Sequence, residues 1–202
     1  MGKIRSALEI ALERTESVKS DKGSIGQFEA KQKGKKLANQ FLDGPEPLGS
    51  GVKSLEEEIK KAAKDEQENL KQGIYDILIS RIVLPASEDD LDRIDAASRG
   101  LQAVIGGKRF GETARQLVQI MKQYIQEAAR YEEAIKRQYA PKLRQKEEEL
   151  SRRMGRQIKL DPFQDPEFTA FFNQNMNTLK GNYQAAVDQV REEALRLFEE
   201  SR

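Results

Sequence analysis

The sequence predicts an all-α protein: an elongated helical bundle dominated by a long antiparallel hairpin that resembles a coiled coil. Apolar residues recur every three or four positions through much of the chain, which places them on one side of a helix and does not suit a strand. Charged residues make up 34% of the chain and hydrophobic residues 37%. That balance favours long helices with much exposed surface over a globule with a thick core.

The longest predicted helix spans residues 110–156. Its first apolar positions are spaced four, three, four, three and four, in the series Leu117, Met121, Tyr124, Ala128, Tyr131 and Ile135. The spacing then changes at Tyr139 and Leu143, on either side of Pro141. Proline lacks an N–H and costs a helix interior about 3 kcal/mol. We therefore predict a kink near Pro141 and leave a complete break as the alternative.

The last predicted helix spans residues 166–201 and folds back along the long helix. Asp165 can cap its first turn, and Pro166 has the fixed φ angle that suits the first helical position. Its apolar stripe consists of Phe172, Met176, Leu179, Tyr183, Ala186, Val190, Ala194 and Leu197. A short turn between the two helices would bring their stripes face to face, with the tyrosines of both stripes packed in the seam.

Two further helices are predicted between the N-terminal region and the hairpin. The first spans residues 54–84, starts with the capping-box spacing of Ser54 and Glu57, and ends before Pro85. The second spans residues 88–105, where Ser87 is the expected N-cap. The two glycines that follow residue 105 are expected to end this helix.

The N-terminal residues 1–43 are predicted to form a helical arm. Its first helix covers residues 3–18 and its second covers 27–42, joined by a polar connection from Ser20 to Gly26. Gly34 lies inside the second helix, at a cost of about 1 kcal/mol relative to Ala. The glycine- and proline-rich residues 44–53 form a linker to the bundle of residues 54–202. Whether the arm packs on the bundle is left open.

Part of this arm resembles known sequences. The segments IRSALEIALERT (residues 4–15), GKKLA (34–38) and FL (41–42) together resemble the opening of a group of small uncharacterised bacterial proteins. The resemblance covers only the N-terminal part of the chain. It implies no catalytic residues and no particular function.

The residue types that are missing exclude several classes of chemistry. The chain has no Cys and no His, which excludes disulfide scaffolds, thiolate metal sites, thiol nucleophiles and histidine bases. We therefore expect no enzymatic activity and name no catalytic, cofactor-binding or metal-binding residue. No apolar run approaches the roughly 20 residues that cross a bilayer. The N-terminus does not have the pattern of a signal peptide, so the expected location is the cytoplasm.

Two groups of basic residues are candidate anion contacts. The first is Lys31, Lys33, Lys35 and Lys36; the second, at the start of the long helix, is Lys108 and Arg109. A helix N-terminus with free N–H groups can hold an anion. However, the net charge is only +1 and no aromatic residues alternate with the lysines, so nucleic acid is not the expected partner. Binding of nucleic acid or an anionic membrane through residues 31–36 is the alternative function.

The leading functional prediction is a non-enzymatic structural or adaptor protein that acts through helix–helix contacts. Narrow apolar stripes bury little area in a pair of helices and gain from further helices. A protein partner or a second copy of the chain, in a homodimer, would supply them. The candidate partner-binding residues are the apolar positions of the N-terminal helix, Ile4, Leu8, Ala11 and Val18. The identity of the partner, the pathway and the oligomeric state are left open.

Overall fold

The computed structural model describes the backbone of residues 7–44, 48–106 and 108–202, and the side chains of these ranges except for 7–23 and Lys108. Within them the chain is helical and contains no strand, so the all-α prediction is confirmed. The helices are α1 (Ala7–Leu42), α2 (Val52–Lys61), α3 (Lys64–Ser80), α4 (Asp89–Ile105), α5 (Lys108–Met154) and α6 (Pro166–Glu200). A short 3-10 turn, η1 (Pro162–Gln164), precedes α6.

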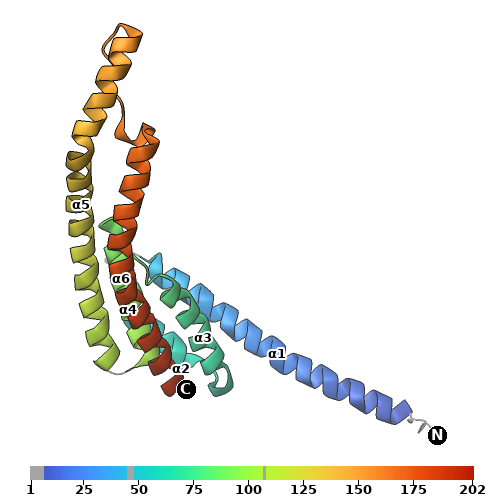
Figure 1. Cartoon of the computed structure of the whole chain (residues 1–202). Coiled ribbons are helices and arrows are strands. Elements are labelled where there is room, and N and C mark those ends of the chain that lie inside the picture. The colour runs from blue at the N-terminus through green and yellow to red at the C-terminus, as the bar shows by residue number, and fades with distance from the viewer. Residues whose placement is uncertain (1–6, 45–47, 107) are drawn as a thin grey trace.

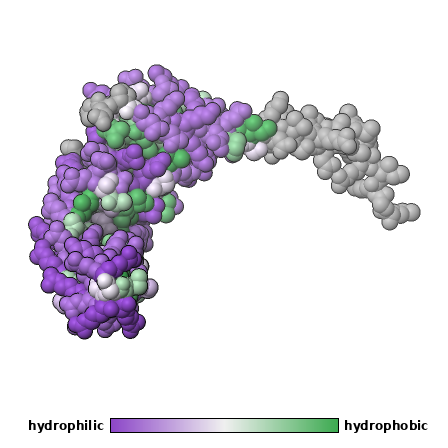
Figure 2. Space-filling view, turned by 90° about the horizontal axis from the view of Figure 1, so that it is seen from above, coloured by the Kyte–Doolittle hydropathy of each residue, from purple (hydrophilic) through white to green (hydrophobic). Residues whose placement is uncertain are grey.

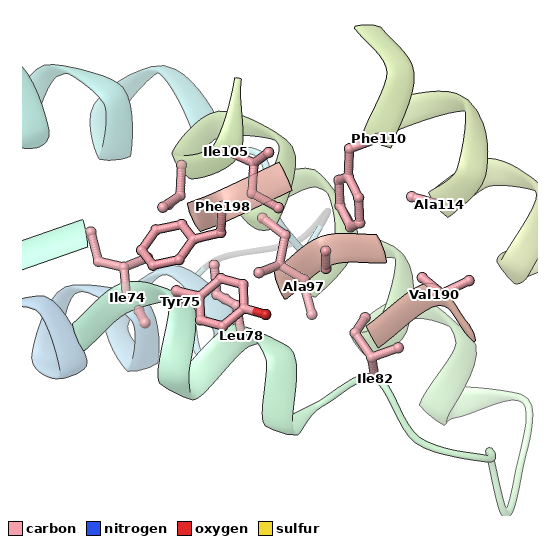
Figure 3. Close-up of a cluster of buried hydrophobic side chains, with 14 of the residues drawn as sticks. Ile74, Tyr75, Leu78, Ile82, Ala97, Ile105, Phe110, Ala114, Val190 and Phe198 are labelled. Carbon is pink, nitrogen blue, oxygen red and sulfur yellow. The ribbon is translucent and has the colours of Figure 1, made fainter. Parts of the chain in front are cut away.

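The helices form an elongated bundle. The long helix α5 and the returning helix α6 lie side by side, the shorter helices α2, α3 and α4 gather at one end of this pair, and α1 runs along α3 and extends beyond the bundle (Figure 1). The main core lies where these helices meet. Figure 3 shows this core, in which the ring of Tyr75 from α3 stacks on Phe198 from α6, with ring centroids 4.3 Å apart.

The predicted antiparallel hairpin is present. Tyr124 of α5 contacts Tyr183 of α6 with ring centroids 5.1 Å apart, and Tyr139 contacts Phe168 nearer the tip. The helix α5 continues through Pro141, so the alternative of a complete break is wrong. Figure 1 shows that α5 is curved rather than straight. Tyr131, which we expected in the seam, is 39% exposed.

The helix predicted over residues 54–84 is wrong, because the structure has two helices there. Ala62 and Ala63 adopt extended backbone angles between α2 and α3. This break allows the apolar faces of both helices to reach one core, in which Leu55 of α2 and Leu70 of α3 are buried. The predicted capping box is also wrong, since α2 begins at Val52 and its N-cap is Gly51.

The start of α4 also differs from the prediction. Glu88, rather than Ser87, is the N-cap, and it makes no side-chain capping bond. Instead, the Asp90 carboxylate accepts hydrogen bonds from the backbone N–H groups of Ala86 (2.8 Å) and Ser87 (3.1 Å). The predicted end is confirmed: Gly106 has a φ of 78°, and its N–H donates to the Gln102 carbonyl.

The N-terminal region is one helix rather than two. The segment from Ser20 to Gly26, predicted as a connection, is part of the continuous helix α1. The second half of α1 belongs to the bundle core, since Ala30, Ala38 and Phe41 are buried. The question of whether this region packs on the bundle is therefore answered for residues 30–42.

Candidate protein-interaction surface

Helices α1 and α3 cross with their backbones in direct contact at two glycines. A Cβ atom on Gly34 would lie 2.2 Å from the carbonyl oxygen of Leu70, and one on Gly73 would lie 2.1 Å from the carbonyl oxygen of Lys31. No side chain fits at either position without moving a helix. The sequence offered one signal of this crossing: each of the two helices carries a glycine in its interior, where glycine is otherwise unfavourable.

Other contacts fix α1 on both sides of this crossing. The Lys31 ammonium lies 2.8 Å from the Asp76 carboxylate, near the C-terminal end of α3. At the C-terminal end of α1, the Phe41 ring packs against Gly100 of α4 and against Gly49, where added Cβ atoms would lie 2.8 Å and 3.3 Å from it. Because Lys31 meets Asp76 while the later residue Gly34 meets the earlier residue Leu70, α1 and α3 are antiparallel. The second half of α1 is held to the bundle along its length.

The described side chains of α1 that directly precede this anchored half, those of residues 24–29, lie at the surface. From Ser24 to Glu29 each residue is exposed, apart from the half-buried Gly26. The exposed residues include two large apolar side chains, Ile25 (54% exposed) and Phe28 (62% exposed). Figure 2 shows hydrophobic atoms at the surface of the described part of α1 that lies farthest from the bundle. We call Ile25 and Phe28 the exposed pair.

Ile25 of the exposed pair lies on the same side of the helix as two of the predicted partner-binding positions, Ala11 and Val18. Ile4 lies outside the described residues, and so do the side chains of Leu8, Ala11 and Val18. However, because α1 is continuous, positions 11, 18 and 25 recur every seven residues on one helix and share one side. Sequence reasoning missed the exposed pair because it placed Ile25 in a connection and Phe28 in a separate helix.

The lysines of residues 31–36 are partly neutralised. Lys31 forms the ion pair with Asp76, and Lys35 is half-buried. Lys33 and Lys36 are exposed, although Lys33 is close enough to Glu58 to contribute, after Lys61, to lowering the pKa of that carboxyl. The four charges therefore do not form one free basic surface.

The second predicted anion contact, at the start of α5, lies beside α6. The side chain of Lys108 lies outside the described residues, and the Arg109 guanidinium is 3.2 Å from the Glu193 carboxylate. A groove of about 540 Å³ lies here between α5 and α6. Arg196 also lines it, and its guanidinium bonds Glu193 and Glu200. Both arginines thus already have carboxylate partners.

A polar cluster joins the two helices near the hairpin tip. Asp165 is only 7% exposed, and its carboxylate accepts hydrogen bonds from the backbone N–H of Glu167, the Tyr139 hydroxyl (2.9 Å) and the Lys146 ammonium (2.7 Å). Lys146 is the main cause of the lowered pKa of Asp165, while burial raises the pKa of Tyr139. Because each of these groups is satisfied by another, we interpret the cluster as a structural connection.

Among the described residues, no group of three or more acidic side chains is placed to hold a metal ion. The same part of the chain has no helix that combines the length and apolar character needed to cross a membrane.

Comparison with known proteins identifies a family for this chain but assigns it no activity. The model of a family of unknown function, DUF6657, matches residues 56–196, from α2 to near the end of α6. The matched part begins after the residues that carry the N-terminal resemblance, and it agrees with that resemblance in pointing to uncharacterised proteins. No curated protein and no solved structure matches the chain.

Proposed function

Since the chain belongs to DUF6657, a family of unknown function, we propose from its structure that it is a non-enzymatic adaptor or structural protein that binds other proteins through α1. The observation that carries this proposal is the contrast between the two parts of α1. Residues 30–42 are fixed on α3, whereas both side chains of the exposed pair are more than half exposed. A helix that is anchored at one end and apolar on its free part can dock against another helix or in a groove.

The chemistry of the exposed pair supports a protein partner. Ile25 and Phe28 are three residues apart, so they lie on neighbouring positions of one helix face. Large apolar side chains of this kind, and aromatic ones above all, are the residues that anchor protein interfaces. The anchored half of α1 also reduces the conformational freedom that binding would otherwise cost. That the protein works in the cytoplasm, is bacterial, and uses its hairpin as a coiled coil are further parts of this proposal.

The test is capture of the tagged full-length protein from cells of its own source. The variant Ile25→Asn/Phe28→Asn removes the apolar face, and Leu195→Asn is the matched control, because Leu195 is a 46% exposed apolar residue on α6. Half of each sample is treated with nuclease. We expect proteins that co-purify with the wild type and with Leu195→Asn, with or without nuclease, and that are lost from the double variant.

Two results would overturn this proposal. If the double variant retains every co-purifying protein, the binding surface does not include the exposed pair. If the co-purifying material is lost on nuclease treatment, the protein is an electrostatic binder of nucleic acid. The exposed positions of Lys33 and Lys36 favour that second function, and their replacement by glutamine would then abolish the capture.

A further inference from the structure

The charge order of the free part of α1 is the starting observation. Taken outward from the midpoint between residues 17 and 18, each charge between residues 13 and 22 has an opposite charge at the same distance on the other side. The pairs are Glu13 with Lys22, Arg14 with Asp21, and Glu16 with Lys19. Two copies of this helix, placed antiparallel about that midpoint, therefore bring opposite charges to the same heights.

The positions of two of these charges make the match relevant to an interface. Arg14 and Asp21 are seven residues apart, so they lie on one side of the continuous helix α1. Arg14 is three residues from position 11 and four from position 18, and Asp21 is three residues from position 18 and four from position 25. Both therefore border the face to which Ile25 belongs. Charges that border an apolar seam determine partner choice and orientation in paired helices.

We propose that a second copy of the chain covers this face, with the two α1 helices antiparallel and centred between residues 17 and 18. This inference rests on the proposed function, because it takes α1 as the binding helix and names its partner. Arg14 of each copy then lies at the height of Asp21 of the other. Phe28 lies at the height of the small residue Ala7 of the other copy, and Ile25 at the height of Ile10.

The opposite orientation is unfavourable. In a parallel pair in register, Arg14 would lie beside Arg14 and Asp21 beside Asp21. Charges that border the seam of paired helices set the orientation of the pair, so like charges at these positions disfavour the parallel arrangement. The overlap of residues 7–28 is roughly 33 Å long. An interface of this size gives a reversible dimer rather than an obligate one.

The first test measures self-association of the purified full-length chain by sedimentation over a concentration series. The variants Arg14→Asp and Asp21→Arg each place like charges together at two points of the dimer. Each is expected to weaken the dimer about tenfold. The double variant Arg14→Asp/Asp21→Arg restores both pairs, and an equal mixture of the two single variants restores them between different chains. The control is Arg152→Asp at the exposed hairpin tip, which makes the same charge change outside α1.

The second test measures orientation by crosslinking. Because the chain has no native cysteine, a single introduced cysteine reports on one position. Val18→Cys lies near the centre of the proposed pair, so a short bismaleimide should link two copies. In Ala11→Cys the two cysteines are separated by roughly 20 Å along the axis and should not link. A parallel pair would link at both positions.

Three outcomes would overturn the inference: a wild-type chain that stays monomeric over the series, a double charge variant that fails to recover, or efficient linking at Ala11→Cys. These outcomes leave the proposed function testable by itself. If the purified chain is monomeric while capture from cells still depends on the exposed pair, α1 binds a different protein and only this inference fails. If capture is also independent of the exposed pair, both fail.

Discussion

Gly34 of α1 and Gly73 of α3 lie against each other's helix backbones, so that a methyl group on either one would overlap a carbonyl oxygen of the opposite helix. This contact explains why a helix with little apolar character packs tightly on the bundle over its second half. It also determines where the free part of α1 begins, because the exposed residues start directly before the crossing. The contact at the two glycines thus determines where α1 leaves the bundle.

The first prediction concerns this crossing. Replacing Gly34 or Gly73 with Ala would favour the helix by up to about 1 kcal/mol, but overlap with the opposite backbone should exceed that gain. We expect each variant to lower the free energy of unfolding by about 1–3 kcal/mol, measured in urea. Gly181→Ala is the control, because it lies in α6 with no atom within 4 Å of the added Cβ, and it should stabilise the protein. Stabilisation of Gly34→Ala to the same extent would contradict the proposed close contact.

The second prediction concerns the polar cluster at the hairpin tip. Tyr139→Phe keeps the ring against Phe168 and removes only the hydroxyl that donates to Asp165. A hydrogen bond to a charged group contributes about 1.5–3 kcal/mol, and we expect a loss of free energy of unfolding in the lower part of that range. Tyr131→Phe is the matched control, because Tyr131 is exposed on the same helix. Equal stability of the two variants would show that this hydrogen bond does not support the hairpin.

The third prediction is a pH dependence. The pKa of Asp165 is lowered in the folded chain, mainly by its bond to Lys146, so folding favours the ionised carboxylate. Its stabilising contribution is complete above the unfolded pKa of about 3.9 and is lost as the pH falls through the lower folded value. Asp165→Asn lacks this contribution. We expect the stability difference between wild type and Asp165→Asn to shrink steadily as the pH falls below about 4. A difference that stays constant from neutral to acid pH would contradict this role of the carboxylate.

Local signals in the sequence predicted several elements correctly. Asp165 caps α6 and Pro166 opens it, as expected, because both effects depend only on neighbouring residues. The apolar spacing of α5 and α6 likewise predicted the hairpin. The end of α4 at Gly106 followed from the conformational freedom of glycine alone.

The errors arose where packing between distant segments decides the structure. Ala62 and Ala63 are residues that favour a helix, yet the chain is extended there because α2 and α3 pack on one core. Gly23 and Gly26 led us to expect a connection within α1, although their cost is only about 1 kcal/mol each and no proline interrupts the helix. That error hid the exposed pair, and the contact between Gly34 and Gly73 could not be predicted from either segment alone.

The most direct test of the central claim is the solution mass of the full-length chain, measured by light scattering as a function of concentration for the wild type and for Ile25→Asn/Phe28→Asn. We predict that the wild type rises from the mass of one chain toward that of two, and that the double variant stays at the mass of one. A wild type that remains a single chain throughout, or a double variant that associates as strongly, would contradict the claim that this face of α1 binds a second copy.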